Sequence, residues 1–477
     1  MRWPRAILVL LVGLNALLAF VVPGRALAAP RRNVLVVETD DQTMNDLASM
    51  PHVRALIADH GVSFTNSFVS LSQCCPSRAT FLTGQYAHNH GVLTTQPPFG
   101  GFPAFHDKQS LPVWLQRAGY RTALVGKYFN KYGRPDPTYV PPGWSDWHGL
   151  EGGSVYHYEG FQINDNGHVR TYPGQYQSDV LEALDQRFIR TSATGHKPFF
   201  LWATFVAPHI GTPRGDLFAP PKLHEAVPLS IFANPFLGID MPRTPAFNEA
   251  DVRDKPRDIR RRPLIGPAEQ VELQQVWARR QEALQSVDED VVRLLRTLRA
   301  THTLRNTLVI FTSDNGYLVG EHRVLDGKVL PYEPSIRVPL LMRGPGIPQD
   351  VSRSQLVFNG DLAPTIVAAT GAHAAWPMDG ESLLPIARDN ARSRRAILLE
   401  GPPHGDKHGA LEFAGVRTRR AVYVRYHDGE TELYNLRRDP YELRNLAGRP
   451  ADRALQTRLA RRLDRLRWCS GPACRAA

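Results

Sequence analysis

Residues 33–39 read Asn-Val-Leu-Val-Val-Glu-Thr, a short apolar run rich in valine that ends directly before Asp40 and Asp41. A run of this length and composition is typical of a strand that is buried on both faces of a parallel sheet. Residues 307–312 read Thr-Leu-Val-Ile-Phe-Thr and have the same character. They lead into Ser-Asp-Asn-Gly at 313–316, so two predicted strands end in acidic and amide side chains.

Helical patterns separate further apolar runs of this kind. Strands are predicted at 121–125 and 199–205, and residues 268–299 carry apolar side chains at helical spacing. Strands that alternate with helices indicate an α/β fold, with a large mixed, mostly parallel sheet sandwiched by helices. Ligand sites in such sheets lie beyond the carboxyl ends of the strands, so the acidic residues mark the edge where we expect the chemistry. Residues 211–267, rich in proline and charge, predict a long surface excursion.

The pattern changes after about residue 370. Residues 421–426 and 432–436 alternate as in a small antiparallel sheet, and 452–467 predicts a helix with leucines on one face and arginines on the other. We therefore expect a catalytic domain over 29–370 and a smaller C-terminal domain, with an antiparallel sheet and a helix, over 371–477.

The N-terminus has the features of a signal peptide. Arg2 and Arg5 precede an apolar run at 6–22, and Ala-Leu-Ala at 26–28 is a small-x-small cleavage site. The sequence thus predicts a signal peptide over 1–28 and a secreted, extracellular or periplasm-like protein. An uncleaved anchor is the alternative, but a run of about 17 residues is at the short limit for a bilayer. No stable membrane anchor is expected.

The chain is basic, with a formal net charge of +11 that falls to +8 if Arg2, Arg5 and Arg25 leave with the signal peptide. A basic protein attracts polyanions such as sulfated glycans or nucleic acid. The arginines are scattered, so a solvated arginine-rich surface is an equally good interpretation, and nucleic acid is not the expected partner.

The four cysteines fall into two pairs. Cys469 and Cys474 enclose Ser-Gly-Pro-Ala, which in an exported protein predicts a small disulfide loop closing the tail. A metal site is less favoured there because no histidine lies nearby. Cys74 and Cys75 are adjacent, and since vicinal cysteines rarely pair they need another explanation.

Residues 74–84 supply that explanation, because they read Cys-Cys-Pro-Ser-Arg-Ala-Thr-Phe-Leu-Thr-Gly. The segment resembles the sulfatase signature, in which Cys-x-Pro-Ser-Arg is followed by Leu-Thr-Gly. A buried cysteine pair before a helix is the alternative. In this register Cys74 is the residue that sulfatases modify, and Cys75 occupies the variable position. Segments 361–365, 378–385 and 439–443 also resemble later sulfatase motifs, so the likeness spans nearly the whole mature chain.

The resemblance implies how Cys74 acts. A formylglycine-generating enzyme would oxidise it to formylglycine (3-oxoalanine), an aldehyde whose hydrate carries two hydroxyls on one carbon. One hydroxyl attacks sulfur and expels the alcohol, and the other then loses its proton so that the aldehyde re-forms and sulfate leaves. An ordinary thiol could not perform the second step.

A divalent cation is implied beside this nucleophile. Asp40, Asp41, Asp314 and Asn315 offer oxygen ligands, which suit Ca²⁺ or Mg²⁺, and the same positions together with the modified Cys74 are metal ligands in sulfatases. The choice of Ca²⁺ rests on the resemblance, with Mg²⁺ possible. Helix capping or turn formation is the usual alternative for such residues.

Further charged residues match sulfatase motifs. Arg78 resembles the arginine that steadies formylglycine, Lys127 follows a glycine after a strand, and Lys328 matches the family's second lysine. His209, in Ala-Pro-His, is a candidate sulfate contact or proton donor to the leaving oxygen. His322 is a weaker candidate for substrate binding. A surface lysine or a hydrogen-bonded histidine is the usual alternative for each.

The stretches at 74–78, 88–90, 126–130 and 142–144 and the terminal loop at 469–474 most resemble those of N-acetylglucosamine-6-sulfatases. This resemblance implies the 6-sulfate of N-acetylglucosamine units in sulfated glycans as substrate. Many arylsulfatases have a histidine two residues after Lys127, where this chain has Phe129 followed by Asn130. A broad arylsulfatase remains an alternative, as does a phosphatase or phosphonate monoester hydrolase of the same superfamily. Such phosphatases often use two metals with histidine ligands, and no such second set is apparent. A non-catalytic polyanion-binding protein is the third alternative.

Overall fold

The computed structural model describes residues 31–211, 223, 225–403 and 412–476. The predicted signal peptide at 1–28 therefore lies outside the described residues. Among the helices that are described, none combines the length and the apolar character needed to cross a membrane.

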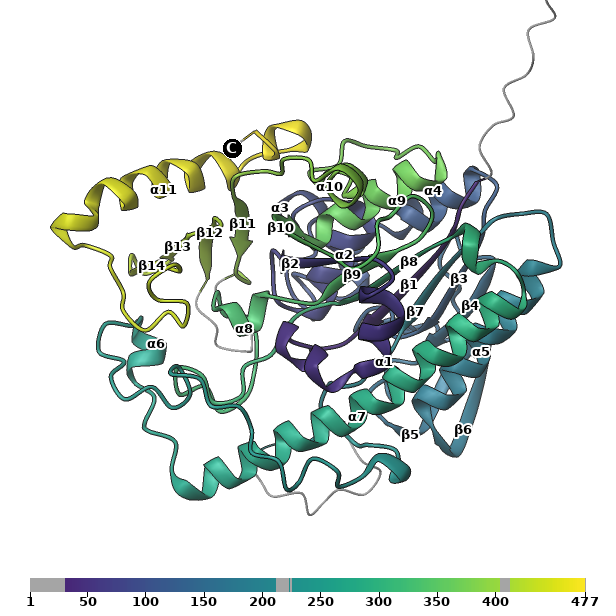
Figure 1. Ribbon diagram of the computed structural model, residues 1–477, viewed down its shortest axis with the longest axis horizontal. Coiled ribbons are helices and arrows are strands. Elements are labelled where there is room, and N and C mark those ends of the chain that lie inside the picture. The colour runs from purple at the N-terminus through teal and green to yellow at the C-terminus, as the bar shows by residue number, and fades with distance from the viewer. Residues whose placement is uncertain (1–30, 212–222, 224, 404–411, 477) are drawn as a thin grey trace, which may run out of the picture. The chain divides into compact units, whose positions relative to one another are not determined.

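A ten-stranded sheet has the order β10-β2-β9-β8-β1-β7-β3-β4-β5-β6 (Figure 1). Strands β8, β1, β7, β3 and β4 pair in parallel, as do β10 and β2, whereas β9, β5 and β6 pair antiparallel with their neighbours. The strands are β1 (Asn33–Thr39), β2 (Val62–Phe68), β3 (Arg121–Gly126), β4 (Asp146–Leu150), β5 (Glu159–Asp165), β6 (His168–Tyr176), β7 (Phe199–Thr204), β8 (Thr307–Ser313), β9 (Leu340–Arg343) and β10 (Val351–Phe358).

Helices cover both faces of this sheet because the central strands are apolar on both sides. Leu35 and Val37 of β1 join one hydrophobic cluster with α5 and α7, and Val34 and Val36 join another with α2, α4 and α9. Figure 1 shows α5 and α7 side by side on one face. The helices that precede the second sheet in the chain are α1 (Pro51–Val53), α2 (Cys74–Thr83), α3 (Ala87–His90), α4 (Leu111–Arg117), α5 (Gln177–Ala193), α6 (Arg257–Arg260), α7 (Pro267–Ala300), α8 (Glu333–Ile336), α9 (Leu362–Thr370) and α10 (Leu384–Asp389).

A second sheet of four antiparallel strands follows, with helix α11 (Arg453–Leu466) packed on it. Three leucines of α11 at 459, 463 and 466 are buried in the cluster that this sheet forms. The strands are β11 (Ile397–Glu400), β12 (Phe413–Arg417), β13 (Ala421–Tyr426) and β14 (Thr431–Asn435). The predicted fold class is thus confirmed, while the domain boundary near residue 370 stays a prediction.

Candidate active site

The parallel strands bring the predicted site residues to one edge of the large sheet. In the β1–β8 ladder Thr39 lies opposite Ser313, so the residues that follow these two strands leave the sheet together. Thr204 of β7 lies opposite both Glu38 and Gly126, which brings the end of β3 to the same edge. The carboxyl ends of four strands therefore converge, as expected for a ligand site in an α/β sheet.

Cys74 is the first residue of α2 and is buried against this edge. Its Sγ lies 2.9 Å from Nζ of Lys328 and 3.4 Å from Oδ1 of Asp40. Burial, and then the charge of Asp40, raises the pKa of the Cys74 thiol far above its ordinary range, so the unmodified side chain is a poor source of thiolate. The positive end of the α2 dipole favours negative charge at this position.

Two lysines neutralise the two aspartates after β1. Lys127 pairs with Asp40, and Lys328 pairs with Asp41. Burial alone would lower the pKa of each lysine, but the adjacent carboxylate outweighs it and holds the pKa well above the usual value. Both lysines are therefore cations over the whole physiological range. Gly126 permits the turn to Lys127, since its φ is +111° and a Cβ there would lie 1.9 Å from the carbonyl oxygen of Thr204.

Arg78 ties α2 to the strand ends from inside the protein. Its Nε donates to Asp314 at 2.9 Å, and its Nη1 donates to Thr204 Oγ1 at 2.7 Å and to the carbonyl oxygen of Lys127 at 2.8 Å. The side chain is fully buried. Arg78 thus fixes the first turn of α2, and with it Cys74, against three strand ends.

The donor atoms at this edge suit a hard cation. One ligand atom each from Asp40, Asp41, Cys74 and His209 can be chosen so that all lie within 4.8 Å of one another. In addition, Oδ2 of Asp41 and Oδ1 of Asn315 are buried oxygens without a hydrogen-bond partner among the described residues. Buried oxygens of this kind need compensation, and carboxylate and amide oxygens are the ligands that Ca²⁺ and Mg²⁺ prefer.

Asp314 is placed somewhat differently from the other predicted ligands. Its Oδ2 accepts the hydrogen bond from Arg78, and its Oδ1 lies 3.2 Å from the backbone nitrogen of Asp41. Both oxygens of its carboxylate are thus engaged within the protein, and Asp314 is not one of the residues whose ligand atoms lie within 4.8 Å of one another.

The charges of the protein alone come close to cancelling at this edge. Arg78, Lys127 and Lys328 are cations, and Asp40, Asp41 and Asp314 are the carboxylates beside them. Burial raises the pKa of Glu38, which also faces Arg78, to about 8, so that this side chain is largely neutral at pH 7. A divalent cation would give the site the net positive charge that an anionic ester requires.

His209 comes from the chain just after β7 and faces the same group. Its Nδ1 lies 2.7 Å from the carbonyl oxygen of Ile210, which assigns the proton to Nδ1, and its Nε2 lies 3.6 Å from Oδ2 of Asp41. Burial lowers the pKa of His209, so the neutral ring is favoured. Tyr156 stacks on the ring with centroids 4.2 Å apart and receives a hydrogen bond of 2.7 Å from Asn130.

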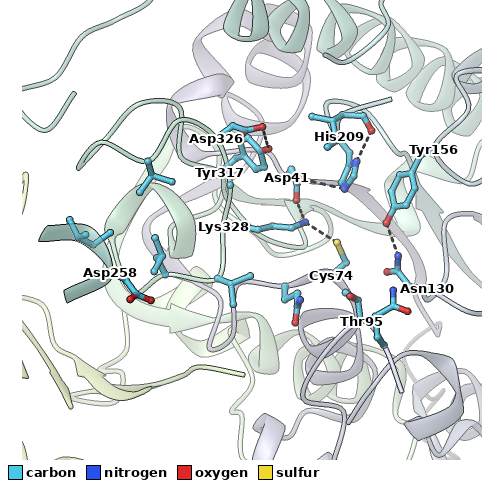
Figure 2. A pocket seen from close by; sticks show the side chains of 18 of the residues that line it. Asp41, Cys74, Thr95, Asn130, Tyr156, His209, Asp258, Tyr317, Asp326 and Lys328 are labelled. Carbon is cyan, nitrogen blue, oxygen red and sulfur yellow. Dashed lines mark hydrogen bonds and ion pairs between the residues drawn. The ribbon is translucent and has the colours of Figure 1, made fainter. Parts of the chain in front are cut away.

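A cavity of about 480 Å³ opens onto these groups (Figure 2). Figure 2 shows Cys74, Lys328, Asp41 and His209 converging from different elements on one space. The wall also includes Thr95, Gln96, Asn130, Tyr156, Asp258, Ile259, Arg262, Tyr317 and Asp326. Three of these wall residues, at 258, 259 and 262, belong to the predicted surface excursion, whose described part therefore contributes to the cavity.

The structure places His322 apart from this group. Its Nδ1 pairs with Glu249 at 2.7 Å and its ring packs on Tyr332. It lines a neighbouring cavity rather than the one at Cys74. A role for His322 in substrate binding thus stays an untested prediction.

Sequence reasoning missed Tyr156 and the structural part played by Asn130. Tyr156 lies in the connection between β4 and β5, in a segment without a recognised motif. Asn130 is predicted only as part of the stretch at 126–130 that resembles N-acetylglucosamine-6-sulfatases, yet its side chain donates to Tyr156 and its backbone nitrogen lies 3.2 Å from Sγ of Cys75. The Gly-Lys motif at 126–127 is the feature of the sequence closest to these residues, since Asn130 follows it by three positions and contacts Tyr156.

Comparison with known families settles the broad assignment. The sulfatase family matches residues 32–372, which is most of the chain. The chain belongs to the sulfatase family. A second family, described as N-sulphoglucosamine sulphohydrolase, C-terminal, matches residues 320–468. The similarity therefore continues through the four-stranded sheet and α11.

The chain is also similar to individual sulfatases. The N-acetylglucosamine-6-sulfatase of Homo sapiens is 33% identical over 95% of this chain and 87% of the relative. The extracellular sulfatase SULF-1 homologue of Drosophila melanogaster is 34% identical over 82% of this chain. The match covers only 35% of that relative's length, and 51% of the corresponding protein of Caenorhabditis elegans.

Solved structures share the fold. The structure of BT4656 in complex with its substrate D-glucosamine-2-N,6-O-disulfate has a TM-score of 0.73 and covers 91% of this chain and 97% of that one. Its sequence identity of 24% supports a common fold alone.

Proposed function

We propose that this protein hydrolyses sulfate esters at Cys74, after that residue has been oxidised to formylglycine by a formylglycine-generating enzyme. The single observation that carries the proposal is the arrangement around Sγ of Cys74, which lines one cavity together with Lys328 and Asp41 and has Oδ1 of Asp40 at 3.4 Å. Beside it, the buried Oδ2 of Asp41 has no hydrogen-bond partner among the described residues. In this arrangement Sγ of Cys74 stands in for a hydroxyl oxygen of the aldehyde hydrate. Such a hydrate supplies an oxygen nucleophile and can release sulfate by re-forming the aldehyde.

The side chains around Cys74 suit this chemistry. Lys328 donates toward the position of Sγ and can stabilise a developing negative charge on the attacking oxygen. The carboxylate of Asp40 lies on the other side of the same atom and can accept its proton. Arg78 does not line the cavity, so we assign it the role of fixing the helix that carries Cys74.

The oxygen donors after β1 and β8 would hold a divalent cation, for which we propose Ca²⁺ with Mg²⁺ as the alternative. Asp40, Asp41, Asp314 and Asn315 are the proposed protein ligands, and the group at position 74 would add another. When bound, the cation would supply the positive charge that attracts the sulfate ester and that favours the ionised nucleophile.

His209 is the proposed proton donor to the leaving alcohol. Its Nε2 faces the cavity because Nδ1 is held by the carbonyl oxygen of Ile210. The negative charge of a bound ester would favour protonation of the ring, which burial otherwise opposes. Tyr156, stacked on the ring and held by Asn130, keeps His209 in place.

For the substrate we propose the 6-sulfate of N-acetylglucosamine units in sulfated glycans. The similarity to N-acetylglucosamine-6-sulfatases over nearly the whole chain supports this choice. So does the mixed polar wall of the cavity, in which Asp258, Asp326 and Arg262 offer hydrogen bonds to sugar hydroxyls. Export through the segment at 1–28 is proposed with it, since relatives include extracellular sulfatases.

A substrate comparison tests the proposal. Purified mature protein is assayed with 6-sulfated N-acetylglucosamine, 4-nitrophenyl sulfate and 4-nitrophenyl phosphate. We expect the highest kcat/KM for the sugar sulfate, a lower value for the aryl sulfate and little turnover of the phosphate. Faster turnover of the aryl sulfate would indicate a broad arylsulfatase, and a preference for phosphate would contradict the proposal.

A further inference from the structure

The outer face of α11 carries a continuous stripe of arginines, which we call the arginine face. Arg458, Arg461, Arg462 and Arg465 are spaced three and four residues apart, which places them side by side on the helix surface. Arg395, just before β11, adds a fifth guanidinium. Its proximity to this stripe is shown by Arg462, whose pKa is lowered by burial and then by the charges of Arg465, Arg395 and Arg458.

The fold does not balance these charges. Among the described residues, no ion pair or side-chain hydrogen bond engages any of the five arginines, and Nε of Arg462 is buried without a partner. The acidic residue of α11, Asp464, pairs instead with Arg425. Like charges three and four residues apart destabilise a helix. The opposite face of α11 packs its leucines on the small sheet, so the arginines are held in place from behind.

An exposed tryptophan extends the arginine face. Trp468 is 75% exposed and lies two residues beyond the end of α11, three residues after Arg465. The guanidinium of Arg467 lies 4.8 Å from the centre of its ring. A flat aromatic face left in water is a stacking surface, and the C–H groups of a pyranose ring, with their partial positive charge, pack well on it. Figure 1 shows α11 at the outer side of the four-stranded sheet.

We propose that the arginine face and Trp468 form a docking site for a sulfated polysaccharide. No residue of α11 lines the cavity at Cys74, so this surface is separate from the hydrolytic site. Guanidinium groups pair bidentately with sulfate oxygens, and a polyanion that binds several of them releases counterions. The choice of a sulfated glycan over another polyanion rests on the function proposed above and on the exposed indole.

Binding is measured by titrating the wild-type protein and three variants with heparin oligosaccharides, and with duplex DNA for comparison, at several NaCl concentrations. The first variant removes the stripe (R458Q/R461Q/R462Q/R465Q), the second is Trp468→Ala, and the third is a matched control. The control removes four exposed arginines elsewhere, as R54Q/R117Q/R296Q/R305Q, and so changes the net charge equally. Turnover of 4-nitrophenyl sulfate is recorded for every variant.

We expect the stripe variant to bind heparin on the order of a hundredfold more weakly at 0.15 M salt, with a salt slope reduced by up to about one unit per arginine. Trp468→Ala should weaken binding by about tenfold, as loss of one stacking platform does. The control should change affinity less than about threefold, and all variants should keep wild-type turnover of the aryl sulfate.

Equal losses in the stripe variant and the control would overturn the proposal, because general surface charge would then explain the binding. Unchanged binding after Trp468→Ala, together with equal affinity for duplex DNA, would overturn the choice of a polysaccharide. Binding that depends on the stripe and on Trp468, in a protein that cleaves no sulfate ester, would support the docking site while refuting the proposed hydrolysis.

Discussion

The carboxyl edge of the large sheet and the outer face of α11 both gather cationic side chains, but they differ in how those charges are balanced. At the sheet edge Arg78, Lys127 and Lys328 each have a carboxylate partner inside the protein. On α11 Arg458 and Arg462 have none among the described residues. Paired buried charges fix the geometry of a reacting centre, whereas unpaired exposed charges remain available to a ligand.

This contrast has an energetic consequence. Removing one partner from a buried pair leaves an uncompensated charge and destabilises the fold, whereas removing one of several like charges from a helix surface relieves repulsion. Substitutions at the sheet edge should therefore lower activity and stability and leave glycan binding unchanged. Substitutions on α11 should instead weaken glycan binding and leave activity and stability unchanged.

Substitution of the proposed nucleophile should lower turnover without changing heparin affinity, and so distinguishes the two regions most clearly. Cys74→Ala should lower turnover of an aryl sulfate by about 10⁴–10⁶-fold, the usual effect of deleting a nucleophile, without changing heparin affinity. Cys75→Ala is the matched control, since it removes a buried thiol one residue away that does not line the cavity. Steady-state kinetics on both variants provides the measurement. Turnover of the Cys74 variant close to that of wild type would refute the role of this residue.

Removal of divalent cations should affect the sheet edge alone. Dialysis against a chelator is expected to lower turnover by about 10²–10³-fold, since a cation contributes several kcal/mol of charge stabilisation. Added Ca²⁺ should restore turnover and raise the melting temperature. In Asp41→Asn the thermal shift should be reduced. Heparin binding by the arginine face should not respond to the chelator. A melting temperature that Ca²⁺ leaves unchanged in the dialysed protein would contradict the proposed site.

Substitutions of two buried arginines, Arg78 and Arg394, should distinguish an effect on stability from an effect on kcat. Arg78→Met should destabilise the fold by about 3–5 kcal/mol and also lower kcat, because Asp314 loses its partner beside the reacting centre. Arg394→Met is the control, since Arg394 is also buried, against Asp361 and Glu381, but makes no contact with the strand ends beside Cys74. It should lose a similar amount of stability with an unchanged kcat. Urea unfolding and kinetics on folded protein distinguish the two, and a normal kcat in the Arg78 variant would show a structural role alone.

His88 of α3 contacts the four-stranded sheet and the chain beyond α11, and its contribution to stability should depend on pH. Its Nδ1 lies 2.8 Å from Glu400, and its Nε2 lies 2.8 Å from the carbonyl oxygen of Cys469, just beyond α11. Burial would lower the pKa of His88, but the hydrogen bond to Glu400 outweighs it and raises the pKa above 6.5. The protonated ring can donate to both acceptors at once.

His88→Ala should therefore cost about 1.5–3 kcal/mol at pH 5, where the ring is protonated in the folded state. A raised pKa in the folded state stabilises the protein below the unfolded value of 6.5, and this contribution is lost as the pH rises through the folded pKa. The difference in unfolding free energy between wild type and variant should thus shrink from pH 5 to pH 9. A difference that grows with pH would contradict this assignment.

The smallest expected effect lies on α11. Arg462→Gln should leave stability unchanged or raise it by about 0.2–0.5 kcal/mol, because it removes a like charge at three and four residues from Arg465 and Arg458. The gain should be larger at low ionic strength, where repulsion is less screened. Urea unfolding at low and high NaCl measures it, and a clear loss of stability would show that the arginine has a partner after all.

The central strands β8, β1, β7 and β3 of the large sheet could be predicted because each is a short apolar run that is recognisable in the sequence. The runs at 33–39 and 307–312 correspond to β1 and β8, and the predicted helix at 268–299 corresponds to α7 (Pro267–Ala300). The outer strands escaped prediction, namely β2, β4, β5, β6, β9 and β10. β6 is largely exposed at the sheet edge and includes Pro173, so it lacks the apolar run that marks a buried strand.

The candidate site could likewise be predicted only in part. Residues next to a strand end or within the 74–84 signature are fixed by local sequence, so their convergence follows from parallel pairing. Tyr156, Asp258 and Arg262 reach the cavity from connections whose course depends on tertiary packing. Cys469 and Cys474, predicted as a loop from their spacing, form a disulfide in the structure. The arginine face was expected as one side of a helix, but only the structure reveals that it lacks partners among the described residues.

The central claim concerns the chemical state of residue 74, and mass spectrometry of the peptide spanning residues 70–90 tests it most directly. The peptide is taken from exported protein that is active on a sulfate ester. We expect the mass of this peptide to correspond to an aldehyde or its hydrate at position 74, with Cys75 unmodified. An ordinary thiol at position 74 in protein of full activity would contradict the account.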